Sequence, residues 1–289
     1  YESLMLDLDR ACDNTSDAAA AWTALNEFKD RHLFRIDLRH VLGHCRPFGA
    51  FSEELTELAE LVVGKAMEIA WQQQVPEYGQ PMCDSGITEC HWVVAGLGKF
   101  GGVEMGFASD IELMLIFSEA GRTNGVNSVS NAVFFDHLVN AVATGIAAPQ
   151  DGIFHVDLRM RPFGQAGSGA VSLQDFEKYY ATDGPAWPYE RQALVKFRCV
   201  AGNAKFRAAV TVACHRSIYG TGQFDFSAMH AMRERQIRQL VHGGAINVKL
   251  SDGGIVDCEY ALQALQMTFG DEFLTLRHPN TLRALCEAA

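Results

Sequence analysis

Apolar residues recur at intervals of three and four in the first quarter of the chain, which is the spacing of an amphipathic helix. The pattern is clearest over residues 52–74, where it comprises Leu55, Leu58, Ala59, Val62, Ala66, Ile69 and Ala70. It predicts helices over residues 15–44 and 52–74. Residues 75–90 contain proline, glycine, aspartate and serine instead, so they are predicted to form a linker.

After this linker the pattern changes to short apolar runs that are rich in β-branched and aromatic residues. Residues 92–95, 111–117 and 153–159 are each predicted to form a buried strand. A polar loop at 121–130 separates the second strand from a predicted helix near 131–146. The central part of the chain therefore contains the predicted sheet.

Beyond residue 171 the pattern is almost wholly helical, with predicted helices near 172–181, 186–198, 203–219, 225–241 and 255–269. The sequence thus predicts an α+β protein in which a small sheet is embedded in a mostly helical chain. A length of 289 residues suffices for one large core or two smaller ones.

Charge and composition narrow the classes of function. The net charge of −11 repels nucleic-acid backbones, so no nucleic-acid partner is expected. Apolar runs such as 113–117 are far shorter than the roughly 20 residues of a membrane-spanning helix, so no membrane partner is expected either. The eight cysteines form no CxxC pair, which favours reduced thiols in the cytoplasm. Since Tyr1 precedes no signal sequence, we interpret the chain as a fragment of a cytoplasmic protein.

Three acidic residues on two predicted strands are the main candidate for chemistry. Residues two apart on a strand share a face, so Asp110 and Glu112 project together, about 6.6 Å apart along the strand. Asp157 joins them if the second and third strands are neighbours. Such a cluster can hold two Mg²⁺ ions about 4 Å apart, whereas a separation of more than about 10 Å between Asp157 and the pair would exclude the site.

Glycine and basic residues surround this acid cluster. The stretch before Asp110 contains Gly96, Gly98, Gly101, Gly102 and Gly106, and glycine permits the close main-chain approach that a triphosphate needs. Lys99 can meet phosphate charge, and Arg159 and Arg161 follow Asp157 on the third strand. The alternative interpretation of these charges is a solvated strand edge with a surface ion-pair network.

Two other motifs compete for a ligand. Gly96, Gly98 and Gly101 also spell the GxGxxG of a dinucleotide-binding turn, with an acid at Glu119. That motif needs a helix after its third glycine, and the short glycine-containing interval before residue 111 disfavours one. Elsewhere the trio His40, His44 and Cys45 has a spacing that suits zinc, although such residues are more often ordinary helix-face side chains.

Four sequence blocks carry a resemblance to a known family. They are GLGKFGGVEMGFASDIELMLIF, VDLRMRPFGQAGSGAVSLQDFEKYY, AWPYERQALVKFR and NVKLSDGGIVDCEY, in this order. Together they resemble the glutamine synthetase adenylyltransferase and deadenylylase family over residues 92–270, and the earlier RHLFRIDLRHVLG is similar to the segment that precedes such a domain.

The resemblance implies a polymerase-β-type nucleotidyltransferase domain. It implies an N-terminal helical segment at 1–80, a catalytic core at 81–200 and a C-terminal helical segment, truncated here, at 201–289. Family members carry two such domains, of which one attaches AMP to a tyrosine of glutamine synthetase and the other removes it by phosphorolysis. The implied substrate is ATP with two Mg²⁺ ions, and the implied partners are glutamine synthetase and a PII-type signal protein.

Motif matching assigns roles to individual residues. It places Asp110 and Glu112 as the metal-binding pair and Asp157 as the third acid, although the family usually has Asp at the second position. The residues matched to the phosphates are Gly98, Lys99, Gly101, Gly102 and Ser109. Arg159 and Arg161 are nucleotide-binding candidates because of their charge and their position beside Asp157. In the block GGIVDCEY, Asp257 and Glu259 either support the site or contact the nucleotide, unless they are merely acids favoured at a helix N-terminus.

The implied mechanism is an in-line displacement in which Asp157 takes the proton of the attacking tyrosyl hydroxyl. The sequence leaves open whether AMP is added or removed. It also leaves open a non-catalytic module that binds nucleotide or a signal protein, and a nucleotidyltransferase for another acceptor.

Overall fold

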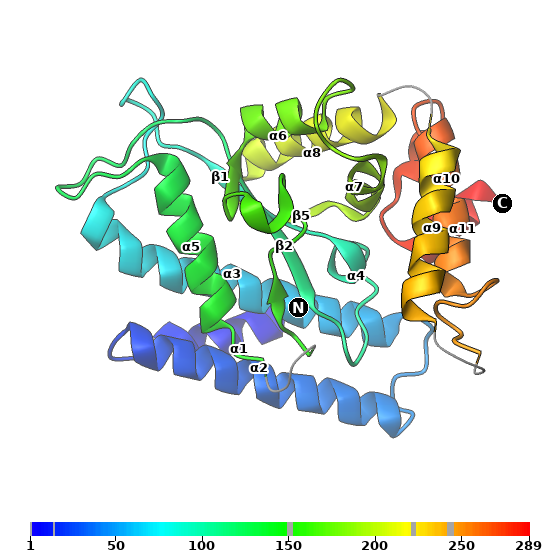
Figure 1. The fold of residues 1–289 in the computed structure, drawn as a ribbon. Helices are drawn as coiled ribbons and strands as arrows, with labels where there is room; N and C mark the ends of the chain where they lie inside the picture. Colours follow the sequence, from blue (N-terminus) through cyan, green and yellow to red (C-terminus); the bar gives the residue numbers. More distant parts are fainter. Residues whose placement is uncertain (1, 14, 149–152, 221–223, 242–245) are drawn as a thin grey trace.

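A computed structural model describes residues 2–13, 15–148, 153–220, 224–241 and 246–289 (Figure 1). The predicted segments 1–80, 81–200 and 201–289 each include a few positions outside these ranges. The chain is mostly helical and contains one small mixed sheet, as predicted. Among the described residues, no helix combines the length and the apolarity needed to cross a bilayer.

Helices from the first half of the chain form a layer under one face of the sheet (Figure 1). They are α1 (Glu2–Asp13), α2 (Ala18–Val41), α3 (Ala50–Tyr78) and α5 (Asn131–Gly145). The predicted helix at 15–44 begins later because the Asp17 side chain caps it, accepting a hydrogen bond from the Ala20 amide at 2.9 Å. Helix α1 was not predicted, and α3 runs three residues past Val75 into the predicted linker before it ends at Gly79.

The sheet has the strand order β3-β2-β1-β5, with β4 pairing β2 off this path. Its strands are β1 (Trp92–Gly96), β2 (Ile111–Phe117), β3 (Val156–Asp157), β4 (Ala170–Ser172) and β5 (Arg198–Gly202). Strand β2 is antiparallel to β1 and parallel to both β3 and β4. This central strand is therefore hydrogen-bonded on both edges and buried on both faces, which suits its continuous apolar run.

Alternate residues of β2 enter two different cores. Ile111 and Leu113 belong to the core that also contains the buried apolar side chains of α3 and α5. Met114 and Ile116 face the opposite core, which helices α6 (Leu173–Tyr180) and α8 (Ala204–Tyr219) cover. Because side chains alternate along a strand, Glu112 projects to this second side, at the end of the sheet that these helices leave open.

The remaining C-terminal elements stand beside the sheet (Figure 1). They are α7 (Pro188–Ala193), the 3₁₀ turn η2 (Leu194–Lys196), α9 (Phe226–Leu240), α10 (Ile255–Phe269), the 3₁₀ turn η3 (Leu274–Arg277) and α11 (Thr281–Ala288). The predicted helix at 186–198 is wrong at its end, because the chain leaves the helix after Ala193 and enters β5. Strand β5 forms by pairing with the otherwise open edge of β1.

Candidate functional site

The glycine-dense turn between β1 and β2 contains the short helix α4 (Gly98–Gly101). Gly98 has φ +50, in the left-handed region that favours glycine. A Cβ at this position would lie 2.4 Å from Oε2 of Glu112, so a side chain here would collide with the carboxylate. Glycine at position 98 therefore lets the turn pass directly over Glu112.

The structure brings the three predicted acids to one end of the sheet. In the parallel pairing of β2 with β3, Glu112 is the register partner of Asp157. Neighbouring strands lie about 4.8 Å apart, well inside the limit of about 10 Å for a shared metal site. Asp110 comes two residues before Glu112 on the same side of the chain, directly before β2 begins.

Asp157 is held by Arg159. The Arg159 guanidinium contacts both carboxylate oxygens, with Nε to Oδ1 at 2.9 Å and Nη2 to Oδ2 at 2.5 Å, and the Arg159 amide donates to Oδ1 at 2.8 Å. Burial raises the pKa of Asp157, but these hydrogen bonds outweigh it, so the pKa is lowered overall. The Arg159 side chain is 67% exposed, so its guanidinium can leave without disturbing a core.

The carboxylates of Glu112 and Asp110 have fewer favourable partners than that of Asp157. Burial raises the pKa of Glu112, and the charges of Asp157 and Asp110 raise it further, against smaller opposite effects of Arg159 and Lys99. Oδ1 of Asp110 is buried and accepts a hydrogen bond from no described residue. A buried acceptor of this kind is costly, and a cation would satisfy it.

We expect Glu112→Gln to stabilise the metal-free protein at neutral pH. A carboxyl whose pKa is raised by folding favours the folded state below its unfolded pKa, and this contribution is lost as the pH rises through the folded value. The gain from Glu112→Gln should therefore shrink in acid, where Glu112 is protonated. Chemical unfolding in chelator at several pH values measures this, with the exposed Glu57→Gln as control. An unchanged or lower stability of Glu112→Gln at neutral pH would contradict the electrostatic picture.

Asp110 and Glu112 line a cleft of about 470 Å³, whereas Asp157 is not among its lining residues. The lining residues are Gly98, Lys99, Glu104, Ala108, Ser109, Asp110, Glu112, Gln192, Ala193, Lys196, Gln236, Lys249, Glu259, Tyr260 and Gln263. Of the predicted site residues, the turn residues Gly98, Lys99 and Ser109 lie here with Asp110, Glu112 and Glu259. Ser109 is buried, and its hydroxyl accepts a hydrogen bond from the Gly106 amide at 2.9 Å.

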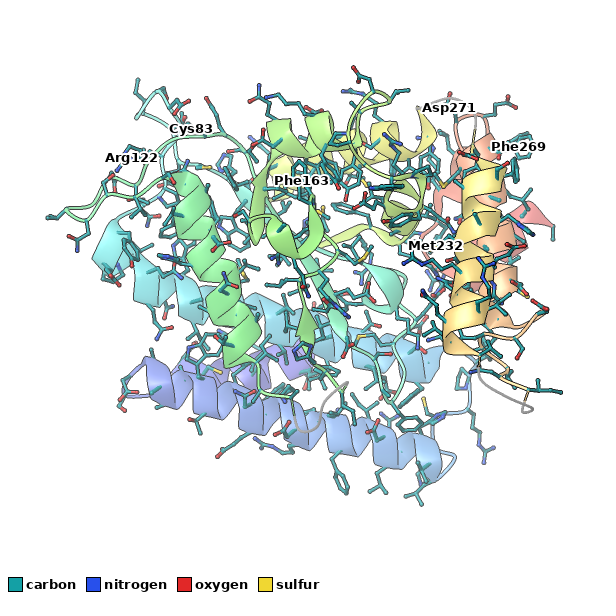
Figure 2. All side chains as sticks on the ribbon, viewed as in Figure 1. Cys83, Arg122, Phe163, Met232, Phe269 and Asp271 are labelled. Carbon is teal, nitrogen blue, oxygen red and sulfur yellow. The ribbon has the colours of Figure 1, made fainter. Side chains whose placement is uncertain are left out.

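Six predicted site residues lie outside this lining, namely Asp157, Arg159, Gly101, Gly102, Arg161 and Asp257. Asp157 and Arg159 form the ion pair described above. Gly101 is packed against the Lys196 carbonyl, and Gly102 faces the Pro279 carbonyl. Arg161 donates to the carbonyls of Leu158 at 2.8 Å and Gly164 at 3.1 Å, which closes the 158–164 loop that carries Phe163 (Figure 2).

The last of these residues, Asp257, is bound to Arg233 on α9. Its Oδ1 accepts from Arg233 Nε at 2.5 Å, and its Oδ2 accepts from the Gly253 amide at 2.6 Å. These hydrogen bonds lower the pKa of Asp257 against a smaller opposing effect of burial. The structure thus gives Asp257 a position in the α9–α10 contact, while Glu259 two residues later faces the cleft.

Several lining residues were not identified from the sequence. Four of them come from two blocks that carry the resemblance, since AWPYERQALVKFR contains Gln192 and Lys196 and NVKLSDGGIVDCEY contains Lys249 and Tyr260, whereas Gln236 and Gln263 lie in none of the blocks. The signal was therefore present, but no spacing rule links these positions to residues about 100 positions earlier.

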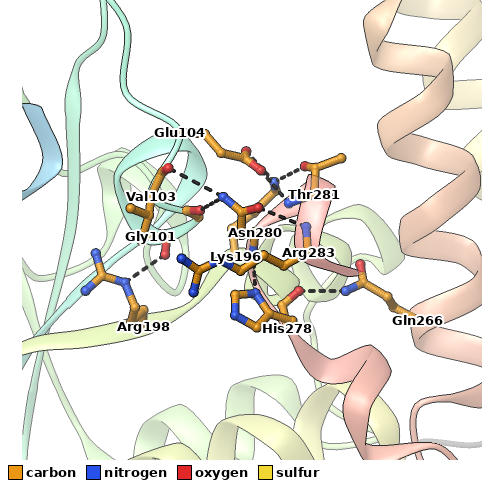
Figure 3. Close-up of polar contacts among 11 residues, drawn as sticks. Gly101, Val103, Glu104, Lys196, Arg198, Gln266, His278, Asn280, Thr281 and Arg283 are labelled. Atoms are coloured by element: carbon orange, nitrogen blue, oxygen red, sulfur yellow. Dashed lines mark hydrogen bonds and ion pairs between the residues drawn. The ribbon is translucent and has the colours of Figure 1, made fainter. Parts of the chain in front are cut away.

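Hydrogen bonds join the C-terminal segment to the glycine turn (Figure 3). The set formed by Lys196, Glu104, Asn280 and Thr281 is called the latch below. Lys196 is buried, and its Nζ donates to Glu104 Oε2 and to Thr281 Oγ1, both at 2.6 Å. The Thr281 amide donates to the other oxygen of Glu104. The Asn280 side chain donates to the Gly102 carbonyl at 2.9 Å while its oxygen caps α11. These bonds fix the α10–α11 region against the turn that holds Lys99.

We expect the latch ion pair to couple strongly. The Lys196 and Glu104 side chains are 8% and 19% exposed, so solvent screens their attraction little. A double-mutant cycle of Lys196→Met and Glu104→Gln in urea unfolding should give a coupling of roughly 1–3 kcal/mol. The matched control is the pair Lys178 and Asp175, 3.8 Å apart and each 66% exposed, which should couple by less than about 0.5 kcal/mol. Similar couplings for both pairs would mean that the latch is solvated.

The acids suit a divalent metal by their ligand type, but in this structure their side chains do not converge into a set of metal ligands. Among the described residues no group of three His, Cys, Asp or Glu side chains converges tightly enough to hold a metal ion. In the acid cluster, Arg159 is hydrogen-bonded to both oxygens of Asp157. Carboxylate oxygens are the ligands that Mg²⁺ prefers. The unsatisfied oxygen of Asp110 and the movable Arg159 therefore fit such an ion.

The two alternative ligand motifs, the candidate zinc trio and the GxGxxG turn, lie in structural environments that do not match those ligands. At the candidate zinc trio, the His40 ring stacks on Phe51 with centroids 4.1 Å apart, and Cys45 contacts Glu54. At the candidate dinucleotide turn, β1 and β2 are antiparallel and α4 ends at Gly101. A dinucleotide-binding turn needs parallel strands and a helix after its third glycine, so this structure excludes one here.

Fold and cleft together define a mixed α+β protein with an acid-bearing cleft between its sheet and its C-terminal helices. A sequence model of the family described as glutamate-ammonia ligase adenylyltransferase matches residues 1–212. The chain belongs to this family.

Curated relatives carry the name bifunctional glutamine synthetase adenylyltransferase/adenylyl-removing enzyme. The protein from Pseudomonas putida is 33% identical over 268 residues, which is 90% of this chain and 27% of the relative. That from Haemophilus ducreyi is 31% identical over 88% of this chain and 27% of its own length, and that from Pseudomonas aeruginosa 30% identical over 98% and 29%. The chain thus spans less than a third of the length of these relatives.

Proposed function

We propose that this chain is a nucleotidyltransferase domain of the polymerase-β type that transfers AMP on glutamine synthetase. In one direction a tyrosyl oxygen attacks the α-phosphorus of ATP and pyrophosphate leaves. In the other, inorganic phosphate attacks the phosphorus of the AMP-tyrosine linkage, and ADP and the free tyrosine are released. Family membership and the names of the relatives support this proposal. Within it, residues 81–200 form the catalytic core, to which the 201–289 segment adds one side of the cleft.

The observation that carries the proposal is the register of Glu112 with Asp157 beside the Gly98 turn. Asp110, Glu112 and Asp157 would hold Mg²⁺, which when bound supplies positive charge to the phosphoryl oxygens. Gly98 lets the backbone approach the phosphates, and Lys99 contributes a positive charge at the same turn. The chain's own contribution is to position these groups and to exclude water.

Asp157 and Arg159 have linked roles in this proposal. While Arg159 holds Asp157, the lowered pKa makes that carboxylate a weak base. Movement of the guanidinium onto a substrate phosphate would free Asp157 for the metal or for the tyrosyl proton. The high exposure of the Arg159 side chain supports such a movement.

Offering both forms of glutamine synthetase to the chain tests the proposal. Unmodified enzyme is incubated with ATP and Mg²⁺, and adenylylated enzyme with inorganic phosphate and Mg²⁺, and the intact mass of each is measured. We expect the gain of one AMP in the first case or its loss in the second. ATP binding by calorimetry without either product would point to a non-catalytic regulatory module, and labelled ATP with other acceptor proteins would reveal a different substrate. Absence of both binding and product would refute the proposal.

A further inference from the structure

Side-chain amides form part of the cleft on elements that carry none of the three acids. Gln192 comes from α7, Gln236 from α9 and Gln263 from α10. Of the acids, Glu112 and Asp157 lie on β2 and β3, and Asp110 directly precedes β2. These helices stand beside the sheet in Figure 1. Together with the hydroxyl of Tyr260, the three glutamines are called the amide wall below. The charged lining residues next to it, Lys249 and Glu259, have opposite signs, so this side of the cleft has little net charge.

The amide wall is ordered by its own hydrogen bonds. Gln192 is 95% buried, and its Nε2 donates to Oε1 of Gln263 at 2.7 Å. Nε2 of Gln236 donates to the Tyr260 hydroxyl at 2.8 Å. Each pair joins two helices across the cleft lining. Because an amide has two donor hydrogens and one acceptor oxygen, these bonds leave donors and acceptors unused.

Gln236 carries the clearest unused group. Its Oε1 is buried and accepts a hydrogen bond from no described residue. A buried acceptor without a donor destabilises the free protein, and a ligand N–H would recover that cost. The terminal torsion of glutamine has a broad energy minimum, so a small rotation turns this oxygen toward a ligand in the cleft.

We propose that the amide wall binds the base of the nucleotide and selects adenine over guanine. This inference rests on the proposed function, and it holds for both directions of the reaction because each has an adenosine group. Adenine presents an amino donor next to a ring acceptor, which an amide matches with its oxygen and N–H. Guanine presents two acceptors at the same edge, which leaves the amide oxygen without a donor. In this arrangement the uncharged base contacts the uncharged amide wall, and the phosphates of the same nucleotide lie toward Lys99 and the acids.

Calorimetry with three ligands tests the assignment on the whole 289-residue chain. The ligands are ATP, GTP and inorganic tripolyphosphate, each with Mg²⁺, and the variants are Gln236→Leu and Gln263→Leu. We expect wild-type protein to prefer ATP. Each variant should weaken ATP about tenfold or more and leave GTP and tripolyphosphate within roughly twofold, so that the base preference collapses. The control is Gln239→Leu, an exposed glutamine on the same helix α9, which should change nothing.

The outcomes separate this inference from the proposed function. If the variants weaken the binding of ATP and GTP equally, or weaken neither, the assignment of the amide wall to the base is overturned. Unchanged binding of tripolyphosphate in that case would show that the phosphate site is intact. Failure of wild-type protein to bind either ATP or tripolyphosphate with Mg²⁺ removes the proposed function itself. Thermal unfolding of every variant establishes that a loss of binding is not a loss of folding, and two variants on different helices guard against one that fails to fold.

Discussion

Replacing Asp110 with asparagine is expected to abolish AMP transfer while leaving the fold intact. Asp110 has a buried oxygen that no described residue satisfies, so it is poised for a cation and contributes little to packing. Its loss removes charge stabilisation of several kcal/mol from the transferred phosphoryl group, which corresponds to roughly a thousandfold in rate. Initial rates with ATP, Mg²⁺ and glutamine synthetase, or with the adenylylated form and phosphate, measure the effect. Binding of Mn²⁺ by calorimetry gives a second readout that does not depend on turnover, and it should weaken in parallel.

Asp84→Asn is the matched control, because this residue is an acid in an exposed turn away from the cleft. It should keep the wild-type rate and the wild-type affinity for Mn²⁺. Asp110→Asn with normal transfer would remove the acid cluster from the mechanism. Normal Mn²⁺ affinity combined with slow transfer would instead assign Asp110 to the substrate and not to the ion.

Elements with a strong local pattern could be predicted from the sequence. The apolar stripe of α3 and the continuous apolar run of β2 specify a helix and a buried strand almost by themselves. Strand β5 could not be predicted in this way, because its residues are only partly buried and it forms by pairing with β1. Local propensity carries no information about a partner strand that lies about 100 residues earlier.

In the site, too, the features set by local geometry could be predicted, and those that depend on distant partners could not. Asp110 and Glu112 share a face because of strand geometry alone, and their match to Asp157 needed only the adjacency of two strands. The pairing of Asp157 with Arg159 is a local contact of the kind that the ion-pair interpretation of these charges anticipates, whereas the latch of Lys196 with Glu104 was not predicted. The latch depends on how side chains from distant parts of the chain meet after folding. Sequence reasoning thus identifies groups that one element presents, and it misses the partners that packing supplies.

Gly101→Ala is expected to destabilise the protein by about 3 kcal/mol or more, at or above the upper end of the usual cost of overpacking. A Cβ at Gly101 would lie 1.9 Å from the carbonyl oxygen of Lys196 and 2.5 Å from that of Gly96. Both atoms belong to backbone, so neither can rotate away. The alanine must therefore separate α4 from η2, which also displaces Lys196 from Glu104. Urea unfolding followed by circular dichroism measures the loss.

Gly106→Ala separates this steric effect from a general effect of glycine in the same turn. Its φ is not positive, and the nearest atom to an added Cβ is Oγ of Ser109 at 4.0 Å. Alanine should therefore be neutral here within about 0.5 kcal/mol, or slightly stabilising because it restricts the unfolded chain. Equal stability of the two variants would show that the α4–η2 contact is loose. A large loss confined to Gly101→Ala would instead establish that glycine 101 serves close backbone packing.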